Sequence, residues 1–324
     1  GYVRFYPQNQ PCPCVFQLFR DLATPQPAPV LMPSTPVQKS NQEATVALIG
    51  AAVAVTAWGA SGVIIKHISL SSSEIAVYRF TFYSSLLAIF MMAKRTPLTI
   101  RALRVSIWGG LALGLDVAFF YEALKRTTVV NAMIIGSLQP IIVSIYGYKA
   151  LGEKIRKQDL GIGLIALLGT VGVLVGSTGS AEWNLSGDLF SVGALFAWSA
   201  YFILSKKTQD RITPMEYTAS TGAITAIMSF IIALVLGVSF TVPSRGDFLW
   251  LLLLAAIAGV IGHSLMNWSL VRIPLWVGSI FTLFVPVAAA ALAWIFLGES
   301  LNALQVLSTV VVILALGSIL RYQR

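Results

Sequence analysis

The sequence has few charged residues and no recognisable nucleotide site. Only 11% of its 324 residues are Asp, Glu, Lys or Arg, whereas soluble domains carry about 25%. It has no G-x-x-x-x-G-K-[ST] phosphate loop and no polar segment long enough to fold into a nucleotide-binding domain. These absences argue against a soluble globular protein and against an ATP-driven pump, so any coupling must use ions, exchange or the solute's own gradient.

Cysteine and histidine are also scarce, with two residues of each type. Cys12 and Cys14 form a C-x-C pair that has no second pair and no histidine nearby, so we assign it no metal. The formal charge of +9 does not indicate a nucleic-acid partner, because the positive residues lie in loops between apolar runs rather than on one basic face. We therefore predict no metal site, no cofactor and no nucleic-acid partner.

What the sequence has in abundance is apolar residues, at 56% of the chain. They occur in runs of about 20 residues, the length of helix that crosses a bilayer core. Backbone groups in lipid must bond within their own segment, so such runs predict helices, and no alternating barrel pattern is present. Ten runs are found, at 46–66, 73–93, 104–123, 129–149, 159–177, 185–205, 214–236, 246–270, 274–297 and 302–320. The prediction is an all-α integral membrane protein with ten transmembrane helices.

The basic residues predict the orientation of these spans. If residue 1 is cytoplasmic, 17 of the 22 Lys and Arg residues fall on the cytoplasmic side, four fall outside, and Arg79 lies within a span. The positive-inside rule then places both termini in the cytoplasm, as an even number of spans requires. The short loops favour a bacterial inner membrane, with a eukaryotic compartment as the alternative.

Residues 1–44 differ in composition from the rest of the chain. They hold eight of the 14 prolines and both cysteines, and they lack a periodic apolar pattern. We predict a disordered cytoplasmic tail. We also expect residues 1–31, which precede Met32, to be dispensable for function.

The remaining chain repeats itself. A shift of 146 residues places Pro140 on Pro286 and Leu151-Gly152-Glu153 on Leu297-Gly298-Glu299, and a shift of 140 places Trp58 on Trp198. This predicts two five-span repeats, at 45–178 and 179–324. Because five is odd, the second repeat enters the membrane from the opposite side, and such inverted repeats are typical of transporters that work by alternating access.

Three features together resemble the EamA-type carriers of the drug/metabolite transporter superfamily, over residues 46 to 320. They are the A-W-G-A-S-G opening at 57–62, the mid-span prolines Pro140 and Pro286, and the two L-G-E endings. The resemblance implies a ten-helix basket around a central cavity, lined mainly by spans 1, 3, 4, 6, 8 and 9. It also implies a permease for metabolites such as amino acids.

Charged and titratable groups within the spans are the leading site candidates. Asp116 lies about 12 residues into the third span, where a carboxylate costs roughly 2.5–3.5 kcal/mol on the insertion scale. Its depth is similar to that of Arg79, so a structural ion pair is one interpretation, and binding of solute or a proton by Asp116 is another. His263 lies near the repeat-equivalent position and titrates near neutrality, so proton coupling through Asp116 and His263 is a further hypothesis.

Aromatic, amide and proline residues complete the predicted site. Trp58 and Trp198 lie near mid-span, where they form either cavity walls or helix packing. Pro140 and Pro286 interrupt their helices and serve either as hinges or as static kinks. Three glycines of the fifth span, Gly169, Gly172 and Gly176, mark where it packs on a neighbour. The predicted solute-binding residues are Trp58, Asp116, Tyr121, Gln139, Trp198, Tyr201, His263 and Asn267.

The function that these features favour is secondary transport of a small-molecule solute, most simply amino acids, by a protein whose other partners are membrane lipids. Nucleotide-sugars, sugar phosphates and drugs are alternative solutes for the same fold, and the oligomeric state is left open. A channel is a less favoured alternative. So is an intramembrane serine protease using Ser61 within Gly59-Ala60-Ser61-Gly62, with His263 as its base; no enzyme activity is predicted.

Overall fold

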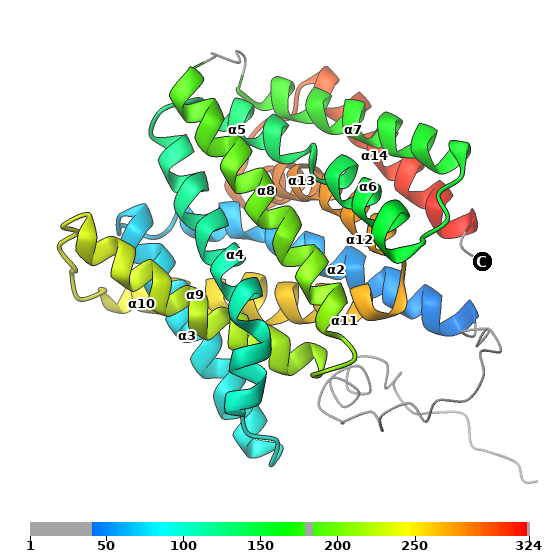
Figure 1. The fold of residues 1–324 in the computed structure, drawn as a ribbon. Helices are drawn as coiled ribbons and strands as arrows, with labels where there is room; N and C mark the ends of the chain where they lie inside the picture. The colour runs from blue at the N-terminus through cyan, green and yellow to red at the C-terminus, as the bar shows by residue number, and fades with distance from the viewer. Residues whose placement is uncertain (1–40, 179–183, 323–324) are drawn as a thin grey trace, which may run out of the picture.

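The computed structural model describes residues 41–178 and 184–322, and Figure 1 shows their arrangement. Within these ranges all regular structure is helical. Nine spans are long and apolar enough to cross a membrane among the described residues, and α14 adds a shorter apolar stretch at Ala303–Ile319. The predicted all-α, multi-pass membrane fold is confirmed.

The helices follow the predicted apolar runs closely. Their bounds are α2 (Asn41–Ile65), α3 (Ser72–Ala93), α4 (Ile100–Leu124), α5 (Val129–Gly136), α6 (Gln139–Leu151), α7 (Lys157–Thr178), α8 (Leu185–Thr208), α9 (Pro214–Val235), α10 (Arg245–Leu254), the π-helix η1 (Ala255–His263), α11 (Ser264–Arg272), α12 (Leu275–Phe281), the 3-10 helix η2 (Thr282–Phe284), α13 (Val285–Leu297) and α14 (Ala303–Tyr322). The fourth span thus consists of α5 and α6, the eighth of α10, η1 and α11, and the ninth of α12, η2 and α13.

The first helix begins before the first apolar run. Residues 41–44, which the sequence analysis assigned to a disordered tail, form the first turn of α2, so that tail boundary was wrong by one turn. Glu43 is compatible with a helix start, because an acidic residue in the first turn interacts favourably with the positive end of the helix dipole. The rest of the expected tail, including Cys12 and Cys14, lies outside the described residues.

Equivalent local signals begin and end helices in the two repeats. Ser71 and Glu74 form a capping box at the start of α3, and Thr213 and Glu216 form one at the start of α9. Gly152 ends α6 with φ of 66°, and Gly298 ends α13 with φ of 68°. The left-handed conformation suits glycine, which explains why each L-G-E sequence terminates a span.

The helix contacts between the two repeats come in equivalent pairs, in which the two repeats change roles. α4 packs on α8, and its counterpart in the other repeat, the η1–α11 segment, packs on α2. Likewise α2 packs on α13, and α8 packs on α5 and α6. α3 with α9, and α7 with α14, are pairs of equivalent helices in direct contact, and the second pair lies side by side at one edge of the molecule (Figure 1). Five spans in each repeat make the two orientations opposite.

The glycines of α7 lie where the sequence analysis expected a neighbour. A Cβ at Gly169 would meet Val312, and one at Gly176 would meet Gln305, so α14 approaches α7 closely. Elsewhere the outer surface is rich in large apolar side chains, including Ile89, Leu168 and Phe296. Such a surface suits lipid, because it offers no polar group that would need water.

Candidate functional site

A cavity of about 330 Å³ lies between the two repeats. Its walls come from α2, α3, α4, α5, α8, η1, η2 and α13. The lining residues are Trp58, Ser61, Ile65, Arg79, Phe80, Leu113, Asp116, Val117, Phe120, Tyr121, Ala132, Met133, Gly136, Ser137, Ser191, Ala194, Leu195, Trp198, His263, Thr282, Val285 and Pro286. The six spans implied by the resemblance all contribute, and α3 adds Arg79 and Phe80.

The cavity is displaced toward one face of the membrane. We call the face where α2 begins the α2-start side and the opposite face the α2-end side. Ile65, Arg79 and Tyr121 belong to helix segments near the α2-end side, and Trp198 and His263 lie near mid-span.

Two tryptophans and a histidine form the floor of the cavity at mid-span. The ring centroids of Trp58 and Trp198 are 5.3 Å apart at an interplanar angle of 69°, and those of Trp58 and His263 are 5.2 Å apart. Trp58 donates its indole N–H to the Ala258 carbonyl of η1 at 3.2 Å. A Cβ at Gly262 would lie 2.6 Å from the Trp58 indole nitrogen, so this glycine lets the ring seat against η1.

Arg79 and Asp116 face this cavity from α3 and α4, but they do not form the predicted direct ion pair. Four ion pairs within 4.0 Å are found in the described part of the chain, and none joins these two residues. The guanidinium carbon of Arg79 lies 5.3 Å from the ring centroid of Phe80, and its Nε is buried without a hydrogen-bond partner.

Tyr201 and Asn267 lie behind the aromatic floor rather than in the cavity lining, and both are buried. Asn267 donates from Nδ2 to the Tyr201 hydroxyl at 2.8 Å and to the Thr218 hydroxyl at 2.9 Å, and its Oδ1 accepts from Ser205 at 2.8 Å. The Tyr201 hydroxyl is also 3.2 Å from Nδ1 of His263. These groups satisfy one another, so they hold the floor in place.

The interruptions of the fourth and ninth spans meet at the centre of the molecule. Gln139, at the start of α6, accepts at Oε1 a hydrogen bond of 2.9 Å from the Thr282 hydroxyl of η2. Pro140 and Pro286 occupy the first turns of α6 and α13. Pro286 lines the cavity, whereas Pro140 lines a separate groove between α6, α7 and the ninth span. Gln139 is fully buried and does not line the cavity.

The α2-start side is closed by contacts to the backbone of the second repeat. Glu153 accepts from the N–H of Leu275 at 2.6 Å and from that of Trp276 at 3.3 Å. Lys206 donates to the carbonyls of Leu270 and Ile273, at 2.5 and 2.9 Å. These bonds tie the ends of α6 and α8 to the turn between the eighth and ninth spans.

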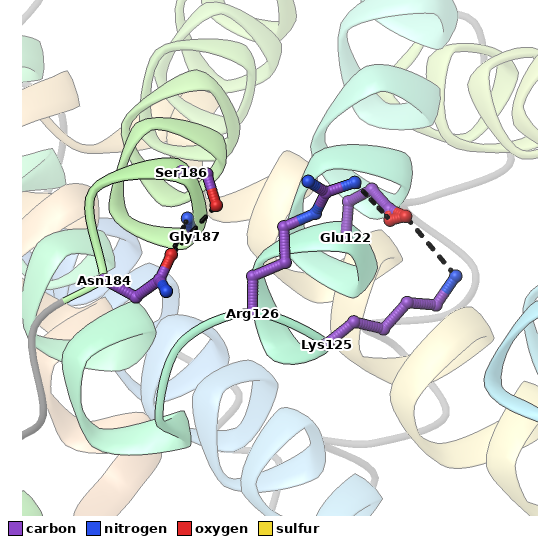
Figure 2. Close-up of polar contacts among 6 residues, drawn as sticks. All are labelled: Glu122, Lys125, Arg126, Asn184, Ser186 and Gly187. Carbon is purple, nitrogen blue, oxygen red and sulfur yellow. Dashed lines mark hydrogen bonds and ion pairs between the residues drawn. The ribbon is translucent and has the colours of Figure 1, made fainter.

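The α2-end side carries ion pairs at the ends of α2, α4 and α13. Glu299 pairs with Lys66, and their side chains are 48% and 57% exposed. At the end of α4, Glu122 lies 3.5 Å from Lys125 and 3.8 Å from Arg126, close to the start of α8, as Figure 2 shows. Exposed pairs contribute little stability. Hydrogen bonds between the repeats also form on this side, and they join Ser69 to Asp247, Thr127 to Asp188, Thr241 to Glu74 and Asn302 to Gly176.

Sequence reasoning missed the π-helix η1. A π-helical turn holds more residues than an α-helical turn, so η1 changes which side chains of the eighth span face inward. His263 lines the cavity, whereas Gly262, the position aligned with Asp116, contacts Trp58. The lining hydroxyls of Ser137, Ser191 and Thr282 were also missed, because serine and threonine are common in packed helices.

The structure gives no support to a serine protease. Ser61 donates its hydroxyl to the Trp58 carbonyl at 2.5 Å, and the imidazole of His263 contacts the Tyr201 hydroxyl. Among the described residues, no hydrogen bond joins Ser61 to His263. A nucleophilic serine needs its base within hydrogen-bond reach, and this pair lacks that arrangement.

Comparison with known proteins identifies related chains. The model of the EamA-like transporter family matches residues 45–175 and 185–321. Among curated proteins, a probable amino-acid metabolite efflux pump of Salmonella typhimurium is 24% identical over 82% of this chain and 92% of its own length. The threonine/homoserine exporter RhtA of Salmonella typhimurium is 25% identical over 66% of this chain and 70% of its own.

Two further comparisons have more limited scope. The aromatic amino acid exporter YddG of Ancylobacter novellus is 26% identical over 47% of this chain and 52% of its own length. A solved crystal structure superposes with a TM-score of 0.74 at 18% identity, covering 84% of this chain and 96% of that one. At that identity the likeness concerns the fold alone.

Proposed function

Because this chain belongs to the EamA-like transporter family, we propose that it is a secondary transporter that moves small metabolites, most simply amino acids, by alternating access. The observation that carries this proposal is the cavity at the interface of two inverted repeats, closed on one side by Glu153 and Lys206. Rocking of similar halves exposes such a cavity to either face in turn.

The choice of amino acids rests on the relatives and on the lining of the cavity. Three relatives are named for amino-acid metabolites or amino acids. The volume of about 330 Å³ is at the small end of the range for ligand sites, which suits a single metabolite better than a nucleotide-sugar. Arg79 and Asp116 give the site charge of both signs, and Trp58 and Trp198 give it apolar surface.

Location and coupling form part of the same proposal. The excess of Lys and Arg in the loops on the α2-start side supports a bacterial inner membrane with both termini in the cytoplasm. In that orientation the cavity is displaced toward the outer face. Asp116 and His263 line the cavity and are the candidates for proton coupling. No enzymatic step is needed for this activity.

The decisive experiment uses the purified full chain in liposomes. We expect saturable uptake of at least one labelled amino acid, and acceleration of that uptake when unlabelled solute is loaded inside. Counterflow of this kind separates a carrier from a channel, which shows no trans-acceleration. A panel that includes a nucleotide-sugar, a sugar phosphate and a cationic drug tests the alternative solutes. Uptake of one of these, without any amino acid, would overturn the amino-acid assignment.

A further inference from the structure

Arg79 and Asp116 form the most unusual pair of side chains in the cavity. They carry opposite charges, they project from neighbouring spans into the same space, and no ion pair within 4.0 Å joins them. Neither side chain forms a hydrogen bond to another described residue. Charges inside a helix bundle are normally paired, so these two cavity-facing groups are candidates to bind a charged solute.

The surroundings of each charge leave its cavity-facing side open. The guanidinium of Arg79 rests near the Phe80 ring, with its centre 5.3 Å from the ring centroid. Asp116 and Tyr121 lie on α4, and Tyr121 also lines the cavity. Both Arg79 and Asp116 retain intermediate exposure although they lie inside the bundle. That remaining surface belongs to the cavity.

A solute with one charge would satisfy only half of this site. A cationic amine would meet Asp116 and leave the guanidinium unmet, whereas a carboxylate would meet Arg79 and leave Asp116 unmet. An unpartnered charge in a low-dielectric site is costly. A solute that carries an ammonium and a carboxylate close together satisfies both, because the guanidinium fork suits a carboxylate.

We propose that Arg79 and Asp116 are the two halves of a zwitterion-binding site, in which Arg79 binds the solute's carboxylate and Asp116 binds its ammonium group. The proposal rests on the proposed transport function and specifies the substrate class of its cavity. It gives Arg79 a recognition role in place of the structural role expected from sequence. The aromatic surface of Trp58, Trp198 and Phe120 then faces the solute's side chain.

The test uses the full chain in detergent and in liposomes, with three labelled probes: phenylalanine, leucine and threonine. For the tightest binder, competition is measured with the amine that lacks the carboxylate and with the acid that lacks the ammonium. We expect each to bind at least about 30-fold more weakly than the zwitterion, as expected when one partner of a buried charge pair is removed. Equal competition by either analogue, or binding of none of the probes, would overturn the proposal.

Charge-changing variants add a result that a general loss of structure cannot produce. We expect Arg79→Gln to favour the amine over the zwitterion and Asp116→Asn to favour the acid, with thermal unfolding as the folding control. Loss of binding to all three compounds by a folded variant would contradict the assigned roles. If a variant does not fold, the analogue series on the unmodified chain decides the question.

Binding and transport fail in different ways. Selective zwitterion binding in detergent without counterflow in liposomes would refute the transport function and leave the binding site intact. Counterflow that does not distinguish the zwitterion from its amine would refute the binding site and leave the transport function intact.

Discussion

Glu153 and Glu299 occupy equivalent positions in the two repeats but bind different partners. Glu153 accepts two backbone N–H bonds at the start of the ninth span, whereas Glu299 pairs with the exposed side chain of Lys66. The lysine equivalent to Lys66, Lys206, donates to backbone carbonyls. Equivalent sequences therefore bind backbone groups on one side of the membrane and form an exposed ion pair on the other.

The closure at Glu153 is expected to control access from the α2-start side. Hydrogen bonds to a charged group contribute about 1.5–3 kcal/mol, so Glu153→Ala should shift the equilibrium toward opening on this side by about tenfold or more. The opening is measured with Ser205→Cys in a chain that also carries Cys12→Ser and Cys14→Ser. The rate at which a maleimide labels this cysteine should rise when the α2-start side opens. Glu299→Ala is the matched control and should not raise that rate. An unchanged rate in Glu153→Ala would contradict the assignment.

Gly262 is expected to determine the position of the Trp58 ring. A methyl group there would lie 2.6 Å from the indole nitrogen, so Gly262→Ala should displace the ring and break its bond to the Ala258 carbonyl. We expect a stability loss of about 1–3 kcal/mol and weaker solute binding. Gly62→Ala is the control, because its Cβ would meet nothing within 4 Å. Thermal unfolding and solute titration measure both effects, and similar behaviour of the two variants would refute the role.

Proton coupling through Asp116 is a separate prediction. The titratable or charged groups that line the cavity with it are Arg79, Tyr121 and His263. If Asp116 exchanges a proton during the cycle, solute entry should change the internal pH of liposomes that contain a pH-sensitive dye. Asp116→Asn should abolish this change, and His263→Gln should alter its dependence on pH. Normal pH dependence in both variants would remove the coupling hypothesis.

The prolines are expected to act as hinges in the interrupted spans. A proline within a helix costs about 3 kcal/mol or more, because it removes a backbone donor and clashes with the preceding turn. Pro286→Ala should allow η2 and α13 to continue as one straighter helix, which slows the change of state. We predict a lower transport rate with unchanged solute affinity, and a similar effect for Pro140→Ala. Unchanged rates in both variants would favour static kinks.

Orientation is tested most directly at the chain end. The distribution of Lys and Arg predicts that the C-terminus is cytoplasmic. A reporter fused after Arg324 that is active only in the cytoplasm should therefore be active in bacterial cells. The same reporter inserted in the loop after α13, next to Glu299, should be inactive. The reverse pattern would overturn the assignment and place the cavity toward the cytoplasm.

The sequence predicted the spans well because their signal is local: a run of apolar residues must be long enough to cross lipid. It also brought Trp58, Trp198, Asp116 and His263 into consideration as residues near mid-span. What it did not predict is rotation about each helix axis. Counting residues from a helix end gave Arg79 and Asp116 similar depths, but the distance between them also depends on the directions in which their side chains point.

Interruptions within spans were only partly predictable. Proline signals the breaks at Pro140 and Pro286, because it cannot donate a backbone hydrogen bond. No comparable signal marks η1, whose residues suit an α-helix equally well. Of the predicted solute-binding residues, His263 lines the cavity, whereas Tyr201 and Asn267 form hydrogen bonds behind the floor.

The contact at Glu153 also affects how this protein can be studied by comparing related sequences. Methods that infer proximity from correlated substitutions detect pairs of side chains that change together. At this contact one partner is the main chain at Leu275 and Trp276, which every amino acid except proline supplies. The glutamate therefore needs no compensating substitution elsewhere, and correlated variation will give no indication of this contact even in a large set of relatives.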